Sequence, residues 1–107
     1  MKIYIPMRLP SLANCRMHWR ALAKLKKQQR LFVALHLPNE LPSLPATIRL
    51  TRIGKRLLDS DNLAISFKSP RDQIADHYGV DDGSPLYRWV YEQRIGKEYG
   101  IEIEVIK

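Results

Sequence analysis

The sequence predicts a single small α/β (α+β) domain, in which two main helices pack on a mixed β-sheet. A chain of 107 residues has room for one hydrophobic core, and its 45% hydrophobic content favours a folded chain over a disordered one. Strand-like alternation and helical periodicity follow one another in the order strand, helix, strand, helix, strand, strand. We therefore expect one domain over residues 1–107.

The first strand and the first helix are expected at residues 2–10 and 15–37. Residues 2–10 alternate as a strand does, and Pro6 either places this strand at a sheet edge or interrupts it. The segment "SLAN" (11–14) supplies a turn and a helix start, and Pro38 ends the helical pattern. The helix is amphipathic, with apolar residues on one side and basic residues on the other. Its apolar residues are Leu22, Leu25, Phe32 and Val33.

A strand is expected at residues 46–53, and a second helical pattern follows at 62–78. Pro70 would remove a hydrogen bond from a continuous helix, so we expect a kink or a restart at residue 70. Gly79 suits the C-terminal cap of this helix. The apolar face that anchors the segment in the core contains Leu63, Phe67, Ile74 and Tyr78.

Residues 86–95 and 99–107 are expected to form the last two strands. Gly96 and Lys97 lie between them, and the simplest connection is a hairpin. The aromatic side chains of the first of these strands share one face and are expected in the core; they are Tyr87, Trp89 and Tyr91.

Positive charge is concentrated in the first third of the chain. The formal net charge is +7, and residues 1–39 contain eight Lys or Arg and no acid. Such a distribution predicts a polyanion partner, and nucleic acid above all, although an ordinary solvated helix face explains the basic residues equally well. The expected DNA contacts are Arg16, Arg20, Lys24, Lys27 and Arg30.

Cysteine usage and apolar runs bear on the compartment. The single cysteine cannot form an internal disulfide, no classical signal peptide is visible, and the longest apolar runs are far shorter than a membrane span. We therefore expect an intracellular, cytoplasmic protein.

All six aspartates fall within residues 59–82, and this acidic segment is the main chemical signal. Asp59 and Asp61 are two residues apart, so in an extended or turn segment their carboxylates share a side and repel unless a cation lies between them. Mg²⁺ prefers such oxygen ligands and completes its coordination with water and phosphate. A second pair, Asp81 and Asp82, follows in a glycine-containing loop that could return to the first.

Lys68 follows Asp61 by seven residues, almost two helical turns, which places a cation on the same helix face. Such a cation could stabilise charge on a phosphate in the transition state. Each feature also has a structural explanation, because an Asp-x-Asp-Asn segment is more often a turn and helix cap than a metal site. The loop is not an EF-hand, since Ala64 occupies its glycine position and Pro70 its final glutamate position.

The stretch "LDSDNLAISFKSPRDQIADHYGVDDGSP" (58–85) resembles the acidic core of the RusA-like crossover junction endodeoxyribonucleases (Holliday junction resolvases), in particular their short phage-type branch. Shared features are an Asp-x-Asp-Asn, a following Lys, an Arg-Asp and a Gly-x-Asp-Asp-Gly. "SLANCRMHW" and "WVYEQ" are similar to that branch as well.

The resemblance implies a homodimeric RusA-like fold, in a bacterial cell or a phage, that cuts four-way DNA junctions with Mg²⁺ or, as a substitute, Mn²⁺. By the same resemblance Asp59, Asp61 and Asp82 hold the metal, with Asp81 as the alternative third ligand. Lys68 stands one turn later than the lysine of the better-known resolvases, whose position is occupied here by Ile65. The rival functions are a less selective nuclease acting on forks or flaps and a non-catalytic DNA-binding protein.

Overall fold

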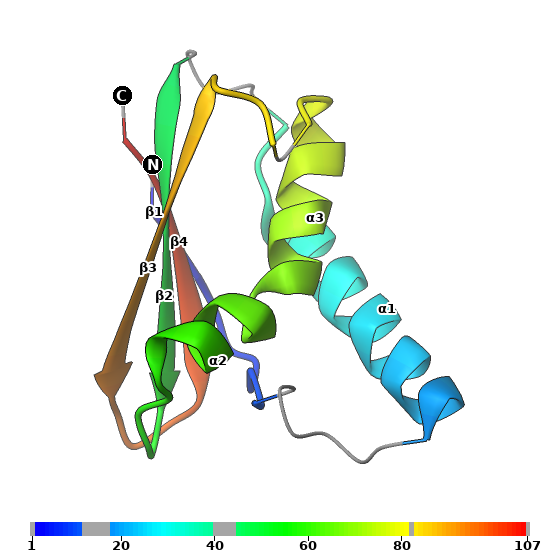
Figure 1. The fold of residues 1–107 in the computed structure, drawn as a ribbon, viewed down its shortest axis with the longest axis vertical. Helices are drawn as coiled ribbons and strands as arrows, with labels where there is room; N and C mark the ends of the chain where they lie inside the picture. Colours follow the sequence, from blue (N-terminus) through cyan, green and yellow to red (C-terminus); the bar gives the residue numbers. More distant parts are fainter. Residues whose placement is uncertain (1, 12–17, 40–44, 82, 107) are drawn as a thin grey trace.

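The structure, a computed structural model, describes residues 2–11, 18–39, 45–81 and 83–106. Within these residues, four strands form one mixed sheet and three helices lie on one side of it (Figure 1). This arrangement confirms the predicted small α+β domain. The elements are β1 (Lys2–Ile5), α1 (Trp19–His36), β2 (Ala46–Gly54), α2 (Ser60–Ser66), α3 (Lys68–Tyr78), β3 (Tyr87–Ile95) and β4 (Gly100–Ile106).

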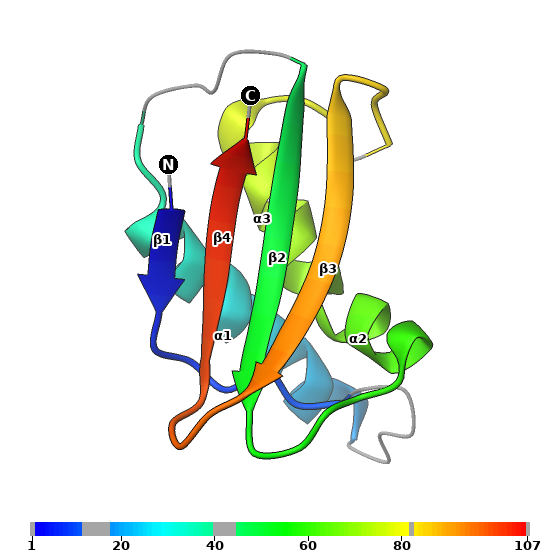
Figure 2. The same cartoon turned by 90° about the vertical axis from the view of Figure 1, so that its left-hand side faces the viewer.

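The strand order is β1-β4-β2-β3, as Figure 2 shows with the open face of the sheet toward the viewer. β2 pairs in parallel with β3 and antiparallel with β4, which in turn pairs antiparallel with β1. The first strand ends at Ile5, directly before Pro6, and lies at the edge where a proline is tolerated.

The predicted hairpin between the last two strands is wrong, because β2 lies between β3 and β4. Their connection crosses the end of β2, where the Gly96 N–H donates to the Gly54 carbonyl at 3.0 Å. A Cβ atom at residue 96 would lie 2.7 Å from the Ile53 side chain, so the close crossing requires glycine there. Alternation had defined the face of each strand correctly, but it carries no information on which strands are neighbours.

The helix-covered face of the sheet supplies most of the core. In the centre, Ile48 lies opposite Trp89 and Val105, and the next residue on the same face, Leu50, lies opposite Tyr91 and Ile103. The expected core position of the β3 aromatics is confirmed, with Tyr87 buried and the other two partly buried against the core cluster. The apolar anchor of the second helical segment is also confirmed, since Leu63, Phe67, Ile74 and Tyr78 are all buried.

The second helical segment breaks at Phe67, three residues before the predicted position. Pro70 is the third residue of α3, where the N–H that proline lacks would have no partner within the helix. A proline is therefore tolerated inside the helix, and the break occurs where the fully buried Phe67 ring enters the core. The predicted cap at Gly79 is confirmed by its left-handed φ of 70°.

α1 packs mainly against α3 and makes a smaller contact with β1. Its predicted end is confirmed, because Leu37 adopts an extended conformation after the last helical residue. Phe32 is more exposed than expected, while Gln29 and Val33 are the buried residues of the helix. The expected start near residue 15 and the "SLAN" segment fall largely on residues outside the described part.

In the described part of the chain, no helix combines the length and the apolar character needed to cross a membrane.

Candidate functional site

Asp59 and Asp61 lie at the N-terminus of α2. The Asp59 side chain caps this helix: Oδ1 accepts from the Asn62 backbone N–H at 2.9 Å and Oδ2 accepts from the Asn62 side-chain amide at 3.2 Å. Asp61 lies in the first turn, where the helix dipole favours a negative charge. Its carboxylate is exposed and makes no hydrogen bond or ion pair with the described residues. The pair therefore contains one structural carboxylate and one that is available.

A groove of about 400 Å³ runs beside the C-terminal half of α2, lined by Ala64, Ile65, Lys68, Arg71 and Tyr91. We call it the cationic groove. The Arg71 guanidinium is oriented within it, because Nη1 donates to the Tyr91 hydroxyl at 2.8 Å and Cζ lies 4.8 Å from the centre of the Trp89 ring. Ile65 follows Asp61 by one helical turn, so the available carboxylate and the groove share one side of α2.

Lys68 begins α3 after the break, and its ammonium forms an ion pair with Asp72 at 3.1 Å. The lysine side chain is 64% exposed, which leaves room for a second anionic partner. Lys68 was expected on the same helix face as Asp61, which assumes one continuous helix. Because the helix breaks at Phe67, the angle between the two side chains is not the one that a continuous helix would give. Lys68 nonetheless lines the same groove as Ile65, the residue one turn from Asp61.

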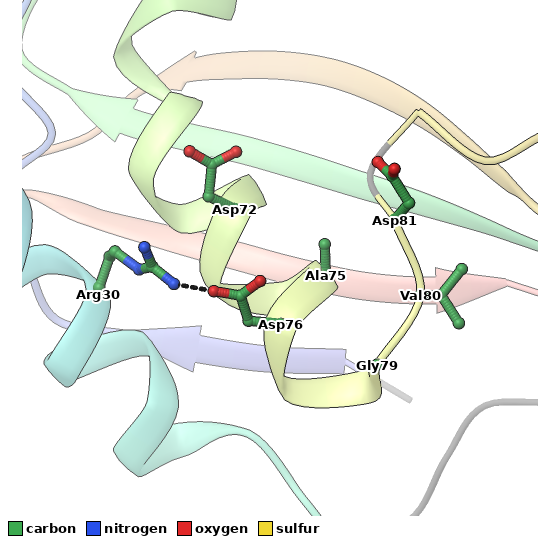
Figure 3. A pocket seen from close by; sticks show the side chains of 7 residues that line it. All are labelled: Arg30, Asp72, Ala75, Asp76, Gly79, Val80 and Asp81. Atoms are coloured by element: carbon green, nitrogen blue, oxygen red, sulfur yellow. Dashed lines mark hydrogen bonds and ion pairs between the residues drawn. The ribbon is translucent and has the colours of Figure 1, made fainter.

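A second pocket, of about 650 Å³, is lined by Arg30, Asp72, Ala75, Asp76, Gly79, Val80 and Asp81. Figure 3 shows Asp72 and Asp76 on neighbouring turns of α3, with Asp81 on the loop that follows the helix. Arg30 reaches over from α1, forms an ion pair with Asp76 and donates from Nε to the Gln73 side chain at 3.1 Å. The sequence pattern alone did not predict this pocket, although the i, i+4 spacing of Asp72 and Asp76 places both carboxylates on one side of α3.

The predicted metal ligands are only partly brought together. Asp59 and Asp61 lie at the start of α2, whereas Asp81 follows α3 at the opposite end of this helix pair (Figure 1). The Asp81 Oδ1 atom accepts from the Gly83 N–H at 2.9 Å, as in an aspartate turn. Asp82 lies outside the described residues. Among the residues that the structure describes, no group of three His, Cys, Asp or Glu side chains could hold a metal ion.

The predicted DNA-contact residues of α1 differ in their surroundings. Arg20, Lys24 and Lys27 are exposed in the first half of the helix, which projects beyond α3 (Figure 1). Arg30 instead points toward α3, where its two interactions with that helix hold it. Arg16 lies outside the described residues.

The open face of the sheet carries a network of charges that sequence analysis did not single out. Glu102 forms ion pairs with Lys2, at 3.2 Å, and with Arg94. The hydrogen bond from Arg94, followed by that from Lys2, holds the pKa of Glu102 below its usual range. Beside it, Arg49 bridges Glu92 at 3.4 Å and Glu104 at 3.0 Å. These charges neutralise one another across the strands, so their presence on this face is explained by the stability that cross-strand ion pairs give to the sheet.

Fold and site together define a basic α+β domain with an acidic helix terminus beside a cationic groove. Comparison with the models of known families, with curated proteins and with solved structures finds no match. The likeness to the RusA-like resolvases therefore rests on sequence patterns alone, chiefly that of residues 58–85.

Proposed function

We propose that this chain is a Mg²⁺-dependent endodeoxyribonuclease that hydrolyses phosphodiester bonds in branched DNA, four-way junctions above all. The observation that carries the proposal is the position of the available Asp61 carboxylate, one helical turn from a groove lined by Lys68 and Arg71. A nuclease needs oxygen ligands for a metal and cations for the phosphate in one place. The resemblance of residues 58–85 supplies the choice of branched DNA.

The oxygen donors of Asp59 and Asp61 fit Mg²⁺, which proteins often hold with one or two carboxylates plus water and substrate phosphate. Asp59 can serve both as cap and as ligand, because each carboxylate oxygen has two lone pairs and accepts one hydrogen bond from Asn62. When bound, the metal lowers the pKa of a water molecule and polarises the phosphate. Lys68 and Arg71 offset the negative charge on the phosphate as it reacts.

The proposal includes a homodimer. A four-way junction has two-fold symmetry and is resolved by two cuts, whereas one chain offers a single pair of acids at the start of α2. Two copies related by a two-fold axis would place one such pair on each strand to be cut. The positive net charge opposes association, so the interface must be apolar.

A non-catalytic DNA-binding protein is the second candidate. One observation favours it: the position of Asp59 is explained by its role as the cap of α2. A nuclease of broader specificity, which cuts forks or flaps, is the third and shares the proposed chemistry.

Cleavage of end-labelled four-way, forked and linear DNA, each with Mg²⁺, Mn²⁺ or EDTA, separates these functions. The proposal predicts paired, symmetric cuts in the four-way junction that require the metal. Cutting of forks at an equal rate identifies the broader nuclease. Binding of junctions without cutting in either metal, at protein concentrations that saturate the DNA, refutes the nuclease and leaves the DNA-binding protein.

A further inference from the structure

Trp19 is the most conspicuous exposed side chain that the proposed chemistry does not use. It is the first residue of α1, at the end that projects from the body of the protein, and it is 67% exposed (Figure 1). A tryptophan ring exposed to this extent leaves a large apolar surface in water, and tryptophan is enriched where proteins bind partners.

Two neighbours contact the ring and leave most of it exposed. His18 stacks beside it, with 5.7 Å between ring centres and 30° between planes, and the Arg20 guanidinium lies 5.2 Å from the ring centre. The His18 Nδ1 atom also accepts from the Arg20 N–H at 3.2 Å, so the backbone at this helix start is fixed. Because both neighbours restrict the ring, stacking on it costs little further conformational freedom.

The charge around Trp19 is unusual for the start of a helix. α1 contains five Lys or Arg and no Asp or Glu, and its first turn holds no acid. Arg20, in the first turn, opposes the helix dipole, and an anion bound there would offset this unfavourable interaction. At 100° per residue, Arg20, Lys24 and Lys27 lie within an arc of about 60° around the helix axis. Measured around the same axis, the edge of this arc is about 80° from Trp19.

We propose that the Trp19 ring stacks on an unpaired base of a DNA strand, while Arg20, Lys24 and Lys27 contact the phosphates of that strand. An aromatic face beside a row of cations is the general design of single-strand binding, because every base has a face that can stack. A second copy of this chain is a poorer occupant, since two such helix ends would bring like charges together. The inference rests on the proposed function only in taking DNA as the partner. Because the arms of an intact four-way junction are fully paired, the stacking on α1 requires that a base at the branch point leaves its pair.

Tryptophan fluorescence reports on this contact directly. The chain has two tryptophans, and the variant Trp89→Phe leaves Trp19 as the sole tryptophan, which is excited selectively at wavelengths that tyrosine does not absorb. The probe is an oligothymidylate of about 12 nucleotides, a length in the range that single-strand sites cover, titrated in EDTA. Stacking should quench the emission and protect the ring from acrylamide, whereas blunt duplex of equal length should do neither. Unchanged emission at saturating oligothymidylate overturns the proposal.

Two substitutions separate stacking from charge. Trp19→Leu should weaken oligothymidylate binding about tenfold without changing the dependence of affinity on salt, because stacking releases no counterions. Lys24→Gln should lower the slope of log affinity against log salt by about one unit. The matched control is Leu35→Ala, a residue 71% exposed near the other end of α1, which should alter neither quantity. Circular dichroism melting checks that each variant is folded.

Other outcomes assign failure to one proposal or the other. Trp19→Leu with unchanged DNA affinity but an altered sedimentation coefficient overturns the stacking and makes Trp19 a contact between copies. Quenching of Trp89→Phe by oligothymidylate, together with a wild-type chain that cuts no branched DNA, supports the stacking and refutes the nuclease. A chain that cuts junctions while Trp19 emission stays constant refutes the stacking alone.

Discussion

The acidic segment 59–82 and the first half of α1 use their charges in opposite ways. Four of the aspartates that the structure describes interact with their own protein: Asp59 caps α2, Asp72 pairs with Lys68, Asp76 pairs with Arg30, and Asp81 accepts from Gly83. Asp61 differs from them in being exposed and, among the described residues, without such an interaction. The basic residues Arg20, Lys24 and Lys27 are likewise exposed, and none of them pairs with an acid in the described part.

The difference teaches that a concentration of charge along the sequence does not by itself locate a binding site. Among the described aspartates, Asp59 caps a helix and Asp76 joins α3 to α1, while Asp72 and Asp81 take part in local interactions. Among the described aspartates, Asp61 is the one without a hydrogen bond or ion pair, and it lies one helical turn from Ile65 in the cationic groove. In the described part of α1, the basic residues without an acidic partner include those of its projecting end.

The largest expected effect comes from Asp61→Asn. Asparagine preserves the size of the side chain but removes the charge on which Mg²⁺ binding depends, so cleavage of four-way junctions should fall by about a hundredfold or more. Junction binding in EDTA should persist, measured by gel shift on the same DNA.

Asp76→Asn is the matched control, because it also removes one aspartate charge but lies in the pocket with Arg30. It should keep full cleavage activity and lose only the modest stability of a partly exposed ion pair, about 0.5 kcal/mol. Full cleavage activity in Asp61→Asn would remove the proposed mechanism.

The next effect tests the basic side of the comparison. Replacing Arg20, Lys24 and Lys27 together by Gln should reduce the slope of log junction affinity against log salt by about three units, one for each phosphate contact. Arg30→Gln should change the slope little, because that guanidinium is engaged by α3. Fluorescence anisotropy over a range of salt concentrations measures both, and an unchanged slope in the triple variant would place the DNA elsewhere.

A smaller effect is expected on the open face of the sheet, where Glu102 lies between Lys2 and Arg94. Because the pKa of Glu102 is lowered in the folded state, its ion pairs stabilise the protein above the ordinary value of 4.5, and this stabilisation is lost as the pH falls through the lower folded-state pKa. Glu102→Gln should therefore lower the free energy of unfolding by about 1 kcal/mol at pH 7. The difference from the wild type should shrink below pH 4.5, as urea titrations at several pH values would show. If the difference in the free energy of unfolding between Glu102→Gln and the wild type is constant with pH, the substitution acts through side-chain packing and not through the lost charge.

The smallest expected effect concerns Tyr87, which is buried and whose hydroxyl has no hydrogen-bond partner among the described residues. Burial raises the pKa of this phenol, so the group stays neutral. Tyr87→Phe removes a polar group that receives no compensation and should raise the free energy of unfolding by about 0.5 kcal/mol. A loss of stability, measured by urea denaturation, would indicate that the hydroxyl has a bound water as its partner.

Local patterns predicted the elements of this fold better than their arrangement. Alternation placed β2 and the core aromatics of β3 correctly, since these depend on which face of a strand is apolar. The hairpin prediction failed because the partner of a strand is decided by the packing of the whole sheet. The helix break was predicted at Pro70, which was wrong because a proline is tolerated in the first turn of a helix. The break lies instead at Phe67, whose side chain is buried in the core.

The candidate site shows the same limit. Spacing alone paired Asp59 with Asp61, and the structure keeps them together at one helix terminus. No spacing rule could show that Arg30, more than 40 residues from Asp76 in the sequence, would take that carboxylate as its partner. The cationic groove was likewise hidden, because Tyr91 comes from β3 and meets Arg71 only after the helices pack on the sheet.

The position of β4 has a consequence for how the chain is made. β4 is the last of the four strands along the chain, yet it lies between β1 and β2 and is the sole strand partner of β1 in the described sheet. On the ribosome, β1 and the edge of β2 must therefore wait, with their backbone groups unpaired and the apolar core open, until residues 100–106 have emerged. Folding is then delayed nearly to the end of synthesis of this domain, and the nascent chain has to be protected from aggregation until β4 completes the sheet.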